Sequence, residues 1–126
     1  MAGGALEVGP INEFFAFAIA HEQQDQGVTS SELASRAGIT RTRAWQLVTG
    51  RRPMTLDEAW RLCLALNLDF IHILGGVENL ARYFLVDDET QSVDFSLWAD
   101  PVRRGVISEA LEMMHATMEP EPDGDD

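Results

Sequence analysis

Residues 28–53 read VTSSELASRAGITRTRAWQLVTGRRP, and this stretch decides the fold. Thr29 stands three residues before Glu32, the spacing of a capping box, in which a hydroxyl and a carboxylate satisfy free N–H groups at a helix start. Apolar residues follow at helical spacing, and Gly38 then provides the left-handed conformation that ends many helices. The first half of the stretch therefore predicts a short helix followed by a tight turn.

The second half of the stretch predicts another short helix. Thr40 is a hydroxyl residue suited to the N-cap position, Gly50 ends the helix, and Pro53 prevents it from resuming. A helical wheel separates an apolar face from a polar, aromatic and cationic face that we expect to be exposed. The outward residues are Thr42, Trp45, Gln46 and Thr49, flanked by Arg41 and Arg43.

These residues resemble the helix-turn-helix of the lambda-repressor-like, or XRE, family of bacterial and phage regulators. The matching marks are Ala34 after Leu33, the turn Gly38-Ile39-Thr40, Leu47, and the exit Gly50-Arg51-Arg52-Pro53. With the helices on either side, the resemblance covers roughly residues 11–74. It implies an all-α fold with a five-helix DNA-binding domain. Two positions depart from the family pattern, because Ser30 stands where Gln is frequent and Val48 where Glu is frequent, so the operator sequence is not predicted.

The distribution of charge supports a nucleic-acid partner. A net charge of −12 taken alone argues against one, because phosphate-binding proteins gain affinity from positive surface. All nine basic residues are arginines, however, and five of them fall within residues 28–53, where Glu32 is the only acid. We therefore expect a local cationic surface on an acidic body. The five arginines are Arg36, Arg41, Arg43, Arg51 and Arg52.

The second helix has the chemistry of a recognition helix. Such a helix presents its first turns to base edges in the major groove, while neighbouring helix ends and loops hold phosphates. Arg41 is the best candidate for base readout, since its guanidinium can bind guanine through two hydrogen bonds, and Thr42 and Gln46 suit adenine or a thymine methyl. Trp45 either presses on the DNA or packs onto the core. Phosphate contacts are expected from Thr29, Ser30, Thr40, Arg43, Arg51 and Arg52.

The whole chain divides into four segments, and residues 28–53 lie in the second of them. Residues 1–9 are rich in Gly and Ala and are expected to be disordered, and residues 10–76 form the DNA-binding domain. Within that domain, helices are expected over residues 10–26, after Thr55, and over residues 70–74. The last of these is expected to stop at the glycine pair at positions 75 and 76.

Residues 77–118 are expected to form a helical extension. It contains a helix over 77–84, a segment over 93–97 whose alternating pattern predicts a short strand or an extended clamp, and a helix that starts at Pro101. This last helix carries an apolar seam that closes over the first domain or meets a second subunit or another partner, and we favour a homodimer. The seam consists of Ile107, Leu111, Met114 and Met118. Residues 119–126 form an acidic tail that we expect to be disordered.

Other classes of function find little support. No apolar run is long enough to span a bilayer and the N-terminus lacks a basic signal region, so we expect a cytoplasmic protein associated with the nucleoid. Cys63 is expected in the core. The three histidines, His21, His72 and His115, lack metal-ligand spacing, and we expect no metal, no cofactor and no enzymatic activity.

The sequence therefore favours a transcriptional repressor that binds double-stranded DNA as a homodimer at a palindromic operator, of phage immunity type or a host regulator. Two alternatives remain. The first is an antitoxin that represses its own operon and holds a toxin through residues after position 76. The second is an acidic protein-interaction module that does not read DNA.

Overall fold

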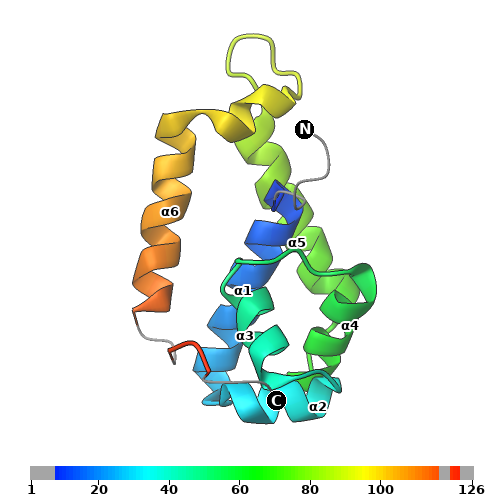
Figure 1. Cartoon of the computed structure of the whole chain (residues 1–126). Coiled ribbons are helices and arrows are strands. Elements are labelled where there is room, and N and C mark those ends of the chain that lie inside the picture. The colour runs from blue at the N-terminus through cyan, green and yellow to red at the C-terminus, as the bar shows by residue number, and fades with distance from the viewer. Residues whose placement is uncertain (1–7, 117–119, 123–126) are drawn as a thin grey trace, which may run out of the picture.

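The computed structural model describes residues 8–116 and 120–122, and every element in them is helical (Figure 1). The absence of a strand from this described part confirms the all-α class. The expected disordered ends, residues 1–9 and 119–126, lie mostly outside it. The elements are α1 (Pro10–Gln26), α2 (Ser30–Ala37), α3 (Arg41–Val48), α4 (Leu56–Ala65), α5 (Phe70–Leu85), the 3-10 helix η1 (Phe95–Ala99) and α6 (Pro101–His115).

Among the described residues, no single helix is both long and apolar enough to cross a membrane. The pair α4 and α5 has that length and composition only when taken together, and the two helices are bent by 120° at the break between them.

Side-chain caps start the helices where the sequence predicts them. Glu32 N donates to Thr29 Oγ1 (3.1 Å) and Thr29 N donates to Glu32 Oε1 (3.0 Å), which completes the predicted capping box of α2. Thr55 and Glu58 form a second capping box at α4. Gly38 ends α2 at a φ of +74°, in the left-handed region. These local interactions fix the start and the end of α2 and the start of α4.

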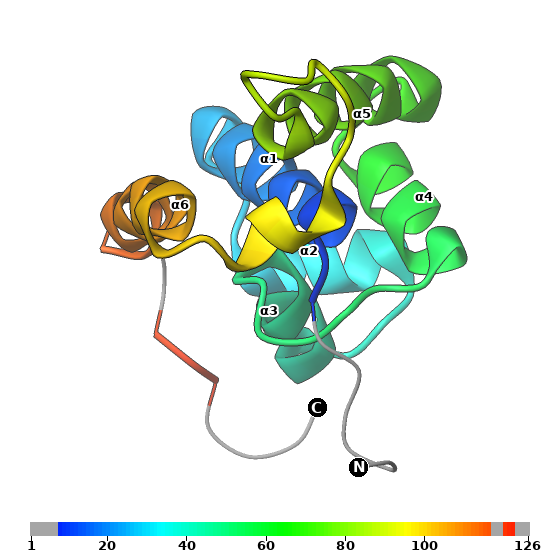
Figure 2. The ribbon, with the colours of Figure 1, turned by 90° about the horizontal axis from the view of Figure 1, so that it is seen from above.

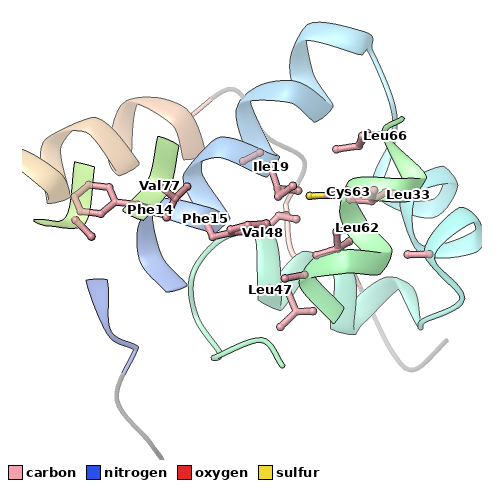
Figure 3. Packing of buried hydrophobic residues seen from close by; sticks show 14 of the residues in the cluster. Phe14, Phe15, Ile19, Leu33, Leu47, Val48, Leu62, Cys63, Leu66 and Val77 are labelled. Carbon is pink, nitrogen blue, oxygen red and sulfur yellow. The ribbon is translucent and has the colours of Figure 1, made fainter. Parts of the chain in front are cut away.

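The core forms where α1 packs against the other helices, and Figure 3 shows its side chains converging. Cys63 is fully buried, as predicted, and burial raises the pKa of its thiol to about 11. The largest fully buried side chains are Ile19, Leu33, Leu47, Val48, Leu62, Cys63 and Leu66. They come from α1 to α4 and the residue after α4, so α2 and α3 share one core with α1 and α4.

Helix α5 does not stop at Gly75 and Gly76, which corrects the expectation of two separate helices. Both glycines keep helical backbone angles, because the side chains beyond them continue the buried face of the helix. Val77 and Ala81 are buried in the same core cluster as α1 residues. The expected domain boundary at residue 76 therefore falls inside a continuous helix.

The segment over residues 93–97 is not a strand. Val93 forms a single antiparallel bridge with Val86, and the chain then turns into η1. Asp94 causes this turn, since its Oδ1 accepts hydrogen bonds from Ser96 N (2.9 Å) and Ser96 Oγ (2.7 Å). The alternating apolar pattern therefore predicted the wrong local structure.

Helix α6 packs against its own chain, on the opposite side of α1 from α4 (Figures 1 and 2). Ile107 is buried in the core cluster and Leu111 packs against that cluster. Of the two alternatives that the sequence left open for this seam, the placement of Ile107 and Leu111 favours closure over the first domain. The side chain of Met114 and all of Met118 lie outside the described residues.

The continuity of α5 predicts a gain in stability when its glycines are replaced. A Cβ added at Gly75 or Gly76 meets no atom within 4 Å, and alanine in a helix interior is favoured over glycine by about 0.5–1 kcal/mol. Gly75→Ala and Gly76→Ala should each raise the free energy of unfolding by about that amount in urea denaturation.

Gly38→Ala provides the control, because this glycine has a positive φ and its Cβ would lie 3.0 Å from Arg61 Nη1. It should lower the free energy of unfolding. A loss of stability in both α5 variants would show that the helix breaks at the glycine pair.

Candidate nucleic-acid interface

Helices α2 and α3 border a shallow hollow on the surface, whose lining is partly polar and partly apolar (Ala34 and Ile39). The hollow has a volume of about 480 Å³, and α2 lies at the end of the molecule opposite the 87–92 loop (Figure 1). Ser31 and Ser35 line it from α2, and Thr40 and Arg41 line it from the start of α3. Hydroxyl groups and a guanidinium beside a helix N-terminus suit an anionic group such as a phosphate.

Four of the predicted residues lie on the accessible side of α3. Thr40 is exposed at the N-cap, where its Oγ1 accepts a hydrogen bond from Arg43 N (3.1 Å). Arg41, Thr42 and Gln46 are only partly exposed on the following turns. One surface therefore combines a guanidinium, a hydroxyl and an amide at helical spacing, which are groups that read base edges.

Two exposed arginines follow α3 immediately. Arg51 N and Arg52 N both donate to Gln46 O (3.0 and 3.3 Å), so the chain turns tightly after the helix. Both arginines are exposed just after the C-terminal end of α3.

Arg43 has a different role from the expected one. Its Nε donates to Glu58 Oε2 and its Nη2 donates to Glu58 Oε1, both at 2.8 Å, and Nη2 also donates to Pro53 O (3.4 Å). This two-pronged ion pair, mostly shielded from water, joins α3 to α4. Arg43 is therefore a structural residue rather than a backbone contact for DNA.

The ion pair changes the acidity of Glu58. Hydrogen bonding from Arg43 lowers the pKa of the Glu58 carboxyl below its ordinary value of 4.5, and burial opposes this effect only in part. The hydrogen bonds that Arg43 donates to Glu58 likewise raise the pKa of Arg43. The carboxylate is thus stabilised in its ionised form in the folded protein.

Trp45 is buried rather than outward-facing, with 6% of its surface exposed. The guanidinium carbon of Arg51 lies 4.5 Å from the centroid of the indole ring and covers it. Thr49, also expected to face outward, is buried and its Oγ1 donates to Trp45 O (2.7 Å). The helical wheel failed here because α3 packs against both α1 and α2, which widens its buried face.

The start of α2 has fewer accessible groups for a phosphate contact than the sequence predicted. Ser30 is only 2% exposed, so its side chain is not accessible to a phosphate. The N–H of Thr29 already donates to Glu32, although its side chain remains at the surface. Ser31 and Ser35 are the exposed hydroxyls of α2 that sequence reasoning missed. Their spacing of four residues places both on the polar side of α2, and this pattern in the sequence could have identified them.

The cationic surface is smaller than the arginine count indicates. Arg36 forms an exposed ion pair with Glu32 (3.7 Å), and Arg43 is bound to Glu58. Of the five arginines, only Arg41 lines the hollow, while Arg51 and Arg52 are exposed after the other end of α3.

No protein-family model, curated protein or solved structure matches this chain.

The ion pair between Arg43 and Glu58 predicts a pH-dependent effect of mutation. Glu58→Gln keeps the acceptor of the capping box but removes the charge, and it should lower the free energy of unfolding at pH 7 by about 1–3 kcal/mol. Because the pKa of Glu58 is lowered on folding, its contribution is complete above pH 4.5 and is lost as the pH falls through its folded-state pKa. Urea denaturation at several pH values should therefore show the difference from wild type shrinking below pH 4.5.

Glu78→Gln is the matched control, since Glu78 forms an exposed pair with Arg82 (2.8 Å) on α5. Exposed pairs contribute about 0–1 kcal/mol, so this variant should resemble wild type. Equal losses in the two variants would show that the Arg43 pair has no special structural role.

Proposed function

We propose that this protein is a sequence-specific regulator that binds double-stranded DNA through α3, and that it acts as a homodimeric repressor. The observation that carries the proposal is the composition of one surface. Arg41, Thr42 and Gln46 lie on the accessible side of α3, beside a hollow with hydroxyl groups, and Arg51 and Arg52 follow directly. On a chain with a net charge of −12, this concentration of arginine is specific to residues 28–53.

The proposed contacts divide into two kinds. Arg41, Thr42 and Gln46 read base edges in the major groove, where a guanidinium, a hydroxyl and an amide each have suitable partners. Arg51 and Arg52, with Ser31, Ser35 and Thr40 around the hollow, hold phosphates and set the register of α3 on the duplex. The acidic remainder of the chain repels DNA and so limits binding outside this surface.

The resemblance to lambda-repressor-like regulators supports the same proposal. In that family, two recognition helices in a dimer meet successive turns of the major groove, about 34–36 Å apart, and the operator is palindromic. A dimer bound in this way would block a promoter by occupying it. A gel shift against genomic fragments at moderate salt would identify the bound sequence.

Arg41 and Arg52 should respond differently to substitution. Arg41→Ala should weaken binding to the selected operator by about 5- to 150-fold, corresponding to 1–3 kcal/mol for a two-pronged base contact, and should relax one base position. Arg52→Ala should weaken binding to all duplexes and reduce the slope of log affinity against log salt by about 1. Fluorescence anisotropy with operator and scrambled duplexes measures both effects.

Arg82→Ala is the control for these titrations, because Arg82 is exposed on α5 outside this surface. It should leave both affinities unchanged. Equal losses on all DNA from Arg41→Ala and Arg52→Ala would refute the division into base and phosphate contacts.

A further inference from the structure

An apolar groove opens between the starts of α1, α4 and α5. Its volume is about 510 Å³, and small-molecule sites in proteins span about 300–1,000 Å³. The lining includes Phe15 and Ala59, which are buried in the core, so the groove reaches inward from the surface. Met54, Phe70 and Leu74 add further apolar side chains. We call this cavity the apolar groove.

The lining of the groove is uncharged. None of the described residues that form it is charged, although 24% of the chain consists of charged residues. A charged ligand would lose its hydration here without gaining a partner of opposite charge. The net charge of −12 also opposes the approach of anions and of a second acidic chain. An uncharged, mainly apolar small molecule meets neither of these costs.

Two polar side chains, Asn12 and Thr55, line the groove, and each has a hydrogen to donate. Thr55 Oγ1 accepts a hydrogen bond from Glu58 N (3.0 Å), which leaves its own hydroxyl hydrogen for another group. Asn12 Oδ1 accepts one from Met54 N (3.3 Å), and Asn12 Nδ2 donates to none of the residues that the structure describes. The molecule best matched to this lining therefore carries a hydrogen-bond acceptor, such as a ketone oxygen.

Hydrogen bonds join the groove to α3. Met54 and Thr55 directly follow Pro53, whose carbonyl oxygen accepts a hydrogen bond from Arg43 Nη2 (3.4 Å). Thr55 N donates to Glu58 Oε1 (2.9 Å), and the same oxygen accepts from Arg43 Nη2 (2.8 Å). The two bonds to Glu58 are already short, so a molecule that moves Met54 or Thr55 lengthens them and loosens the first turn of α3.

We propose that the apolar groove binds an uncharged, mainly apolar small molecule with a hydrogen-bond acceptor, and that this molecule weakens the binding of DNA by α3. An effector that moves Met54 and Thr55 disturbs the ion pair of Arg43 and with it the orientation of Arg41. Coupling between two sites changes affinity by about 5- to 150-fold. The effect on DNA rests on the proposed function, whereas the binding of the small molecule depends on the groove alone.

Prodan is the probe for the test, because it is an uncharged naphthalene with one ketone and its emission shifts to the blue in apolar surroundings. Titration of the full chain should give a blue shift that saturates at one probe per chain. Asn12→Asp should weaken this binding by about 3- to 10-fold, because it removes the N–H donor but keeps the acceptor for Met54 N.

Leu56→Glu should weaken the binding of Prodan by at least about 10-fold, because it brings a carboxylate to the apolar lining. Leu56 is 72% exposed in the first turn of α4, where glutamate favours the helix. Folding should therefore be preserved, and circular dichroism can verify it.

Val102→Glu is the matched control, since Val102 is 77% exposed in the first turn of α6 and does not line the groove. It should bind Prodan as wild type does. The absence of a saturable shift in wild type, wild-type affinity in both groove variants, or an equal loss in Val102→Glu would each overturn the proposal.

A gel shift with the selected duplex tests the effect on α3. Saturating Prodan should weaken DNA binding by wild type at least about 5-fold, and the same concentration should leave Leu56→Glu nearly unaffected. Unchanged binding by wild type would overturn the coupling. A chain that binds Prodan in the groove but selects no duplex would retain the site and reject the regulator. A chain that selects a duplex but binds no Prodan would retain the regulator and reject the site.

Discussion

The paired hydrogen bonds between Arg43 and Glu58 are the interaction on which the candidate interface depends. Helix α3 has only eight residues, too few to be stable alone, so its position comes from its contacts with neighbouring elements. Glu58 is held by the capping box with Thr55 and in turn holds Arg43 at two nitrogen atoms. This series of bonds fixes the first turn of α3 relative to α4. Arg41 and Thr42 directly precede Arg43 on the same turn, so the orientation of Arg41 and Thr42 depends on the same ion pair.

The sequence predicted those features that local interactions determine. Thr29, Thr40 and Thr55 cap helices because their hydroxyls reach backbone N–H groups three residues away, and Gly38 ends α2 through its own backbone freedom. Features that depend on distant partners were not predicted. The pairing of Arg43 with Glu58 spans 15 residues, and the burial of Trp45 reflects the packing of α3 on two other helices.

The continuation of α5 through Gly75 and Gly76 has the same physical origin. A glycine pair is a good helix stop only if the chain gains by turning there. Here Val77 and Ala81 gain more by remaining on the buried face beside α1 than the helix loses by containing two glycines. As a result, the residues after position 76 belong to the same core as α2 and α3, and α6 closes over α1 by burying Ile107. The helices of the candidate interface therefore share a single packed core with α5 and α6.

Two surfaces of different character lie on this body: the cationic polar surface of α3, and the uncharged apolar groove between the starts of α1, α4 and α5. The central claim is that the first reads the sequence of duplex DNA. The most direct measurement is selection of duplexes from a randomised library by the full chain at about 0.15 M salt, where nonspecific phosphate binding is reduced. The claim predicts enrichment of an inverted repeat with half-sites about 10 base pairs apart. Recovery of the library without any enriched sequence would contradict it.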